Sequence, residues 1–262
     1  MRKYKRIRLV ICLMLGVLVF LSFELRLSHD RDNRPEAVST PLLEENGQSL
    51  TLAPTEAPDV TEEFDMTRVP LYTGEPYVII GDNVPDFSDM QGNPEEGSVA
   101  FEQYSEQDAL GRCGVARALL GQELMPTEER DEIGAIKPTG WHTIKYDCIE
   151  DRYLYNRCHL IGYQLSGENA NEKNLITGTR YMNIDGMLPF ENRVARYIRN
   201  TGNHVWYRVA PVFQGENLVA TGVRMEAYSV EDEGAGICFD VFVYNVQPGI
   251  RIDYATGDSF ME

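Results

Sequence analysis

The hydrophobic positions divide the 262-residue chain into three stretches with different patterns. An apolar run without charged residues extends from Leu9 to Phe23 and follows a basic N-terminus. Residues 26–70 are rich in Pro, Glu, Asp, Ser and Thr and contain only scattered leucines. From residue 71 onward, apolar residues recur at the periods of strands and helices. The pattern therefore predicts one folded domain over 71–262, preceded by an apolar segment over 1–25 and a linker over 26–70.

The first 25 residues have the features of an export signal. The apolar run has 15 residues, which is long for a signal-peptide core and slightly short of the roughly 17 to 25 that span a bilayer. The residues from Glu24 to Leu27 contain no small-residue cleavage site. We therefore expect an uncleaved signal anchor, with a cleaved signal peptide as the alternative. In both cases the rest of the chain is exported, either anchored in the cell membrane or secreted.

The linker over residues 26–70 is expected to be a disordered acidic tether. Its composition cannot bury enough apolar area to offset the entropy that ordering would cost. Such a tether would hold the folded domain away from the membrane and let it sample the surroundings.

Alternation of apolar and polar residues in the folded part predicts an antiparallel sheet. Period-two runs cover residues 205–213, 217–230 and 237–246, and turn-forming residues separate them. Shorter β-rich segments lie at Tyr77–Gly81 and at residues 97–104, where an edge strand is expected. Together with the helical segments in the middle of the chain, these strands predict an α+β domain with a central antiparallel sheet.

The middle of the folded part predicts two strands followed by a helix. An extended segment leads from Tyr153 to His159, a polar loop follows, and Leu175–Thr179 forms the second strand. After Asn183, which is expected in a helical turn, apolar residues recur at helical spacing. Pro189 is suited to the first turn of this helix, and a Thr-Gly-Asn sequence provides its stop.

Two further signals concern helix boundaries. Gly186 and Pro189 argue against one straight helix from Asn183 onward, so Glu191 is expected to lie one bend away from Asn183. A Pro-Thr-Glu-Glu sequence predicts a short helical turn over Pro126–Asp131.

Three residues of the middle segment are suited to phosphodiester hydrolysis. His159 has an ordinary pKa of about 6.5 and can take a proton from an attacking water. Asn183 offers a neutral oxygen to a largely hydrated Mg²⁺, and Glu191 lies eight residues further on. Arg157 and Arg180 are cations that can bind a phosphate by charge-assisted hydrogen bonds.

Each of these residues also has a structural alternative. A lone histidine at a strand end is often a packed residue, and an asparagine at a helix end is often a cap. A glutamate in the first helical turn is favoured by the helix dipole, and exposed arginines are often solvated charges. The combination at these spacings, more than any one member, favours a catalytic site.

The string GYQLSGENANEKNLITGTRYMN, which ends at Asn183, resembles the DNA/RNA non-specific endonuclease family, whose core is a ββα-metal finger. The usual motif of that family, Asp-Arg-Gly-His, aligns with Asn156–His159, so its arginine and histidine are kept. Asn156 removes a charge that would orient a neighbour. Cys158 stands where glycine permits unusual backbone angles. The resemblance is strongest over residues 140–200.

The resemblance implies a role for each candidate. His159 would be the general base, and Asn183 would be the one direct protein ligand of Mg²⁺, with Mn²⁺ as the alternative ion. Glu191 would hold a metal-bound water, and Arg157 would contact the phosphate. Cleavage of DNA, with RNA as a further substrate, would leave 5′ phosphates, and no small-molecule cofactor is implied. Further candidates for substrate binding are Arg180, Arg193 and Arg196.

The formal net charge of −17 argues against a tight nucleic-acid binder, because phosphate binding usually requires a basic surface. The distribution is uneven, since residues 145–208 contain nine basic and seven acidic residues. At a screening length of about 8 Å, such local charges outweigh distant ones. A local cationic groove suits a hydrolase that releases its product quickly. The alternatives are a catalytically inactive nucleic-acid-binding protein and an interaction protein at the cell surface.

Four of the five cysteines lie outside the apolar run. They allow two disulfides in three connectivities, and the sequence leaves the pairing open. Their spacings contain no CxxC pair, which disfavours a structural zinc site. The sequence leaves the oligomeric state open as well. These cysteines are Cys113, Cys148, Cys158 and Cys238.

Overall fold

The computed structural model describes residues 64–90 and 100–262, which belong to one compact unit. The apolar segment and the linker up to residue 63 lie outside the described residues, so the signal anchor and the tether stay predictions. Within the described part of the chain, no helix is long and apolar enough to cross a membrane.

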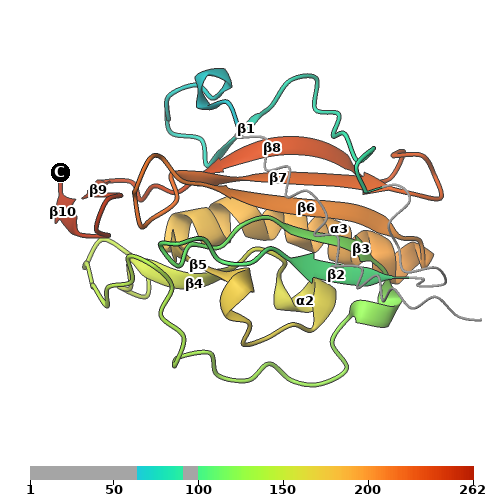
Figure 1. The fold of residues 1–262 in the computed structure, drawn as a ribbon, viewed down its shortest axis with the longest axis horizontal. Coiled ribbons are helices and arrows are strands. Elements are labelled where there is room, and N and C mark those ends of the chain that lie inside the picture. The colour runs from blue at the N-terminus through green and yellow to red at the C-terminus, as the bar shows by residue number, and fades with distance from the viewer. Residues whose placement is uncertain (1–63, 91–99) are drawn as a thin grey trace, which may run out of the picture. The chain divides into compact units, whose positions relative to one another are not determined.

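A six-stranded antiparallel sheet forms the centre of this unit (Figure 1). The three tail strands predicted from period-two alternation are confirmed, as are the short strand at Tyr77 and the edge strand that begins at Phe101. In spatial order the strands are β1 (Tyr77–Ile79), β8 (Cys238–Tyr244), β7 (Gly222–Ser229), β6 (Val205–Val212), β3 (Ala116–Leu120) and β2 (Phe101–Tyr104).

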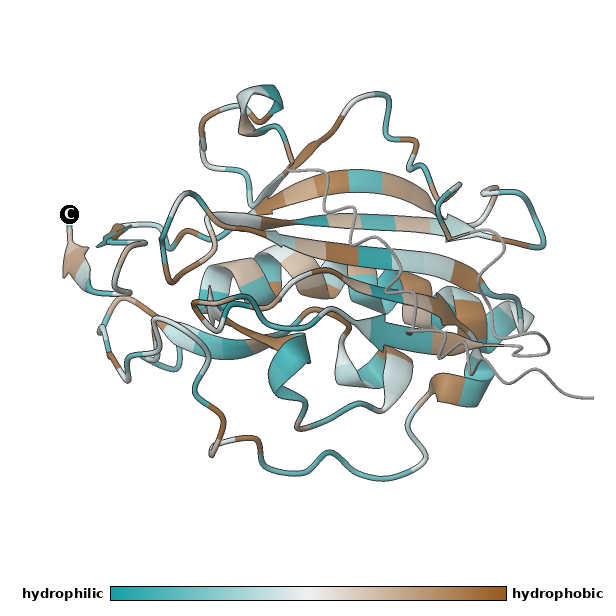
Figure 2. Ribbon diagram, in the orientation of Figure 1, coloured by the Kyte–Doolittle hydropathy of each residue, from teal (hydrophilic) through white to brown (hydrophobic). Residues whose placement is uncertain are grey.

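One face of the sheet packs against the long helix α3 (Leu188–Thr201). The strands alternate between hydrophobic and hydrophilic residues (Figure 2), and inward residues such as Val223 join Val194 of α3 in one buried apolar cluster. This is the arrangement expected when strands of period two face a helix with an apolar stripe. As predicted, α3 has Pro189 in its first turn and ends where Gly202 adopts a φ of 75°.

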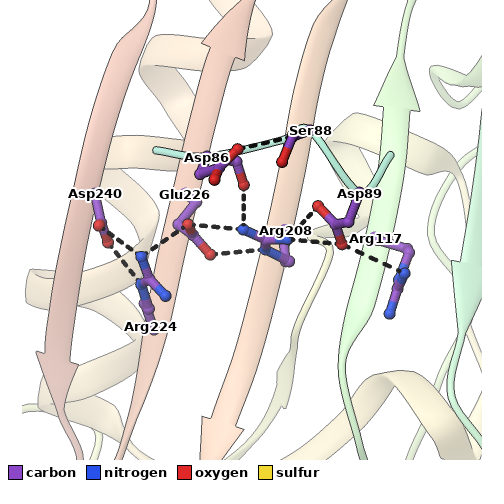
Figure 3. A network of polar contacts seen from close by, with 8 residues as sticks. All are labelled: Asp86, Ser88, Asp89, Arg117, Arg208, Arg224, Glu226 and Asp240. Carbon is purple, nitrogen blue, oxygen red and sulfur yellow. Dashed lines mark hydrogen bonds and ion pairs between the residues drawn. The ribbon is translucent and has the colours of Figure 1, made fainter. Parts of the chain in front are cut away.

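The opposite face of the sheet carries a ladder of alternating charges, which we call the charge ladder (Figure 3). Arg208 on β6 lies 2.8 Å from Glu226 on β7, and Arg224 lies 3.0 Å from the same carboxylate. Arg224 also pairs with Asp240 on β8 at 2.7 Å, and Arg208 pairs with Asp89 at 3.0 Å. Because Glu226 is 1% exposed, its charge is paired where there is little water to solvate it.

The segments before and after β1 pack apolar side chains against this face of the sheet. Phe64 stacks on Phe242 with ring centroids 6.0 Å apart, next to the 3-10 turn η1 (Met66–Arg68). The folded unit thus already includes Phe64, whereas the sequence placed its start at residue 71. A few apolar residues in a largely polar segment are enough to attach that segment to the sheet.

A two-stranded ribbon followed by a helix forms the predicted ββα unit, which we call the finger (Figure 1). β4 (Tyr155–His159) pairs antiparallel with β5 (Leu175–Thr179), and His159 lies opposite the first residue of β5. The connection between them contains the short helix α2 (Tyr163–Ser166) and the 3-10 turn η3 (Glu172–Asn174). Both strands of the finger agree with the sequence prediction.

The helix after β5 is continuous through Gly186 and Pro189, although a π-helical turn interrupts its regular α-helical form. The bend expected between Asn183 and Glu191 stays a prediction. Helical structure runs from Arg180 to Thr201 through a π-helical turn, η4 (Met182–Met187), that leads directly into α3. Gly186 does not break the helix. A Cβ at Gly186 would come within 2.3 Å of the Val243 side chain, so glycine lets the helix approach β8 closely.

A long loop replaces the helical turn predicted over Pro126–Asp131, and that prediction is wrong. Residues 126–137, which we call the strap, contain no helix or strand and follow the 3-10 turn η2 (Gln122–Leu124). Backbone carbonyls of the strap accept hydrogen bonds from Arg157 and Tyr163 of the finger. Side chains distant in sequence therefore satisfy backbone groups that a helical turn would have satisfied locally.

The C-terminal residues form a small hairpin of β9 (Ile250–Ile252) and β10 (Ser259–Met261). All four cysteines after residue 100 are free, so the pairing that the sequence left open resolves to no disulfide. Cys158 is fully buried in the core, whereas its neighbour His159 lines a cavity, as expected for adjacent residues of a strand.

Candidate functional site

A cavity of about 800 Å³ lies where the finger, α2, α3 and the strap meet. Its walls include Arg157, His159, Asn183 and Glu191, four of the residues that the sequence singled out. β4 supplies the first two, and the continuous helix after β5 supplies the other two. This cavity is the candidate active site.

His159 ends β4 with its imidazole held in one tautomer. The residue is 7% exposed, and Nε2 lies 2.8 Å from the backbone carbonyl oxygen of Asn169. Since a carbonyl can only accept, Nε2 carries the proton and Nδ1 keeps its lone pair. Burial, together with the nearby charge of Arg130, lowers the pKa of His159 to about 4. The imidazole is therefore neutral at pH 7 and can accept a proton at Nδ1.

Arg130 of the strap faces this free nitrogen. Its Nη2 lies 3.4 Å from Nδ1 of His159, and both residues line the cavity. No sequence pattern indicated a role for Arg130, because it stands between Glu129 and Asp131 in an acidic run without a recognisable motif. Arg130 reaches the site because of the path that the strap takes through space, and residue spacing alone does not predict that path.

Asn183 lies inside the π-helical turn and lines the cavity. The helix begins before it, at Arg180, so the alternative of a helix cap does not apply. No hydrogen bond within residues 64–90 and 100–262 engages the side-chain amide of Asn183. Its oxygen is therefore available to a ligand in the cavity.

Glu191 lies eight residues further along the same helix and is 9% exposed. Burial raises the pKa of its carboxyl to about 7, although Gln164 and Arg130 act in the opposite direction. The carboxylate lies against the backbone of Gly162, where a Cβ would come within 2.6 Å of Oε2. The lack of a side chain at Gly162 therefore leaves the space that Glu191 occupies.

These oxygen donors fit a largely hydrated divalent cation. Within the described ranges, no group of three His, Cys, Asp or Glu side chains converges to enclose an ion. Asn183 supplies an amide oxygen and Glu191 supplies a carboxylate, in a cavity with room for several waters. Mg²⁺ prefers such oxygen ligands and keeps several of its waters. A cation beside Glu191 would also offset the burial that raises the pKa of its carboxyl.

Arg157 holds the strap. Its Nη2 donates to the carbonyl of Gly134 at 2.8 Å, and its Nε donates to the carbonyl of Ile136. The guanidinium also lies over the indole of Trp141, 4.1 Å from the ring centroid. Arg157 lines the cavity as well, so phosphate contact by this residue stays a prediction that its position permits.

The other three predicted arginines do not line the cavity. Arg180 pairs with Glu150 at 2.9 Å and with Asp151 at 2.8 Å. Arg193 and Arg196 occupy exposed positions on α3, and Arg193 donates to a backbone carbonyl between β7 and β8. Their roles in substrate binding stay predictions.

Comparison with known sequences identifies relatives of this chain. A sequence model of the family described as DNA/RNA non-specific endonuclease matches residues 93–231. A deoxyribonuclease from Streptococcus dysgalactiae subsp. equisimilis is 32% identical over 116 residues, which cover 42% of this chain and 34% of that protein. The match therefore spans about a third of the length of that relative.

Solved structures share the fold. NucA from Streptococcus agalactiae, solved with a magnesium ion bound, is 22% identical with a TM-score of 0.64, over 75% of this chain and 94% of that chain. The Sda1 nuclease, solved with a bound zinc ion, is 27% identical with a TM-score of 0.53, over 62% and 81% of the two chains. These likenesses confirm the predicted α+β fold with a central antiparallel sheet and a ββα finger.

Proposed function

Since the chain belongs to the DNA/RNA non-specific endonuclease family, we propose that it hydrolyses phosphodiester bonds of DNA, with RNA as the alternative substrate, and with little sequence preference. The observation that carries this proposal is the neutral His159, whose unprotonated Nδ1 lies in the same cavity as Asn183 and Glu191. Cleavage with one hydrated metal ion requires a base, a metal ligand and a group that orients water.

In this mechanism His159 acts as the general base. Nδ1 takes a proton from the water that attacks phosphorus, while the Asn169 carbonyl keeps the Nε2 proton and stabilises the imidazolium that forms. Asn183 would hold a divalent ion, Mg²⁺ with Mn²⁺ as the alternative, and Glu191 would hold a metal-bound water. When bound, the ion supplies positive charge to the transition state and to the leaving 3′ oxygen. The products carry 5′ phosphates.

The two arginines that line the cavity change partners when substrate binds. Arg130 donates toward Nδ1 of His159, and this contact must break before the base can work. An anionic phosphate is a stronger partner for a guanidinium than a neutral imidazole or a backbone carbonyl. Substrate would therefore draw Arg130 and Arg157 to its phosphate and release Nδ1 in the same step.

A catalytically inactive binding or interaction protein at the cell surface is the rival function. Such a protein needs arginines, but it gains nothing from a buried, neutral histidine whose tautomer is fixed. It also has no use for an amide oxygen left without a partner beside a buried carboxylate. The site geometry therefore favours hydrolysis.

A plasmid assay tests the proposal. Purified protein with Mg²⁺ should nick and linearise supercoiled plasmid, and EDTA should stop the reaction. His159→Ala should cut about 10²–10⁴ times more slowly, the usual loss for a general base. The control is His142→Ala, which removes a histidine that bonds to the carbonyl of Thr256 and does not line the cavity. Intact plasmid with the wild type, across neutral pH and several divalent ions, would refute the proposal.

The metal ligand has its own test. Asn183→Ala should raise the Mg²⁺ concentration needed for half-maximal cutting, or abolish cutting, without lowering the melting temperature in EDTA. Titrations with Mg²⁺, Mn²⁺ and Zn²⁺ identify the preferred ion, since the related structures contain magnesium or zinc. An unchanged metal titration would exclude Asn183 as the ligand.

We further propose that the protein is exported and held at the membrane by its N-terminal apolar segment, with secretion after cleavage as the alternative. The basic flank and the long apolar run support export. Fractionation of cells that produce the full chain, and of cells that produce a chain without residues 1–25, tests this. Activity in the cytoplasm from both chains would contradict it.

A further inference from the structure

Tyr153 is an exposed aromatic residue in the wall of the candidate active site. Its side chain is 43% exposed and lines the cavity. The Nζ of Lys145 lies 4.3 Å from the centroid of the Tyr153 ring, and an isolated β-bridge joins the two residues. Lys145 contacts the ring from one side, which leaves part of the aromatic surface open to the cavity. Any of the nucleobases can stack on such an aromatic surface, so stacking does not depend on the nucleotide sequence.

Two arginines in the segments around Tyr153 are already paired with neighbouring carboxylates, whereas Lys145 lies against the ring itself. Arg152 pairs with Asp147 at 2.6 Å, and Arg180 is bracketed by Glu150 and Asp151. These pairs lie in the segment that precedes β4 and at the start of the helix after β5. This part of the surface therefore offers little net positive charge to a phosphate backbone.

The strap is acidic where it borders the cavity. Within the described residues, Arg130 and Arg157 are the basic side chains that line the cavity. Four exposed carboxylates flank Arg130 in sequence, and Figure 2 shows the strap as largely hydrophilic. These residues are Glu128, Glu129, Asp131 and Glu132.

This distribution of charges suits a single strand of nucleic acid better than a duplex. A duplex presents two phosphate backbones and binds through many cations. Here the two arginines that line the cavity can hold the phosphate that is cut. A second backbone passing the strap would meet its carboxylates. A single strand can replace the missing phosphate contacts by stacking a base on an aromatic ring.

We propose that Tyr153 stacks on an unpaired base next to the phosphate that is cut, so that the enzyme prefers single-stranded DNA to duplex DNA. The inference rests on the proposed nuclease function and names its substrate class. The cavity volume of about 800 Å³ lies within the range of sites that enclose a nucleotide-sized ligand. Tyr153 is thus a specificity-determining residue and takes no part in proton transfer.

The experiment compares three substrates under one set of conditions. They are a single-stranded oligonucleotide, a hairpin duplex of matched length, and bis(p-nitrophenyl) phosphate, a diester without a base. The wild type should cut the single strand with a kcat/KM at least about tenfold above that for the duplex, the scale of one base–aromatic stack. Tyr153→Ala should raise the KM for the single strand by about tenfold with little change in kcat, and should leave hydrolysis of the small diester unchanged.

Two variants serve as controls. Tyr153→Phe keeps the ring and should retain the wild-type KM. Phe260→Ala removes a ring that is 51% exposed, that carries Arg251 at 5.4 Å from its centroid, and that lies outside this cavity. It should leave all three activities unchanged. A quench of 2-aminopurine fluorescence on binding of a labelled oligonucleotide to Asn183→Ala, absent when Tyr153→Ala is added, would report the stack directly.

The outcomes separate this inference from the proposed function. Cleavage of the duplex as fast as the single strand, or equal effects of Tyr153→Ala and Phe260→Ala, overturns the role of Tyr153 while the nuclease stands. A wild type that cuts none of the three substrates overturns the nuclease itself.

Discussion

The carboxylate of Glu191 occupies the space above the backbone of Gly162, where any Cβ would lie 2.6 Å from Oε2 and 3.0 Å from Oε1. Gly162 has a φ of −61° and a ψ of 143°, which every residue type can adopt. Its lack of a side chain therefore serves the packing of Glu191, and backbone conformation does not require it. A residue without any reactive group thus fixes the position of a charged residue in the candidate active site.

Gly162→Ala should impair cutting while the fold stays stable. The added methyl would push the flexible end of Glu191 out of place, whereas alanine in an extended conformation costs the backbone little. We expect kcat for plasmid nicking to fall by about tenfold or more, the order of effect of displacing a positioned group. The change in melting temperature should stay within that of the control, Gly134→Ala, where a Cβ meets no atom within 4 Å. Equal activity of the two variants would show that the position of Glu191 is unimportant.

His159 and Glu191 act on stability in opposite directions. The pKa of His159 falls from 6.5 to about 4, so the unfolded chain binds its proton first, and stability is lost as the pH falls through this window. The pKa of Glu191 rises from 4.5 to about 7, so the folded chain binds its proton first, and stability is lost as the pH rises. At about 1.4 kcal/mol per tenfold change in proton affinity, each effect reaches roughly 3 kcal/mol.

Single substitutions should reveal these two opposing dependences of the free energy of unfolding on pH. His159→Asn leaves the Glu191 contribution, so its free energy of unfolding should fall relative to wild type as the pH rises from 4.5 to 7. Glu191→Gln leaves the His159 contribution, so its free energy of unfolding should fall relative to wild type as the pH drops from 6.5 to 4. Urea denaturation in EDTA at several pH values measures both. Parallel pH profiles for the two variants would contradict the assigned shifts.

Arg157→Ala should release the strap. The substitution removes two hydrogen bonds to strap carbonyls and the contact with Trp141. We expect a protease that cleaves after glutamate to cut within residues 126–137 faster than in the wild type, and the KM for DNA to rise. Arg157→Lys keeps the charge but lacks the planar fork, so its effect should be intermediate. The control is Arg152→Ala, which removes an exposed ion pair with Asp147. Identical proteolysis of the two alanine variants would show that the strap is held elsewhere.

Glu226→Ala should be strongly destabilising, because Glu226 joins both arginines in the middle of the charge ladder. Loss of one partner leaves charges uncompensated in a buried place, which costs about 3–5 kcal/mol. Glu226→Gln keeps the shape and should cost less. A matched control, Glu216→Ala on an exposed loop, should stay within about 0.5 kcal/mol of wild type. Chemical denaturation measures all three, and a loss for Glu226→Ala no larger than the control would show that the ladder contributes little.

The sheet and the finger were predictable because the residue pattern within each strand is enough to indicate that strand. Period-two runs set β6, β7 and β8, and Leu175–Thr179 has the composition of a buried strand. The continuous helix was not predictable in the same way. Gly186 counts as a helix breaker by propensity, but its role is to let the helix approach Val243 of β8, a contact between residues 57 positions apart.

The candidate site, too, was predictable only where local residue patterns indicate it. His159, Asn183 and Glu191 were found from residue types and spacing, and the structure places them around one cavity. Arg130 was missed and the strap was read as a helical turn, because both depend on hydrogen bonds from finger side chains to a segment some 20 to 35 residues earlier. The pairing of Arg180 with two acidic residues also depends on the tertiary structure, and the sequence around Arg180 did not indicate it.

The π-helical turn makes chain length itself a constraint on the site. The turn, Met182–Met187, contains Asn183 and leads into the helix that carries Glu191, and both residues line the same cavity. Each residue of an α-helix turns the chain by about 100°, and a π-turn holds an extra residue. Deletion of Ile184 would rotate Asn183 by about 100° relative to Glu191, away from the wall that the two residues share. The number of residues between Asn183 and Glu191 is therefore as much a requirement of the site as the identity of the two side chains.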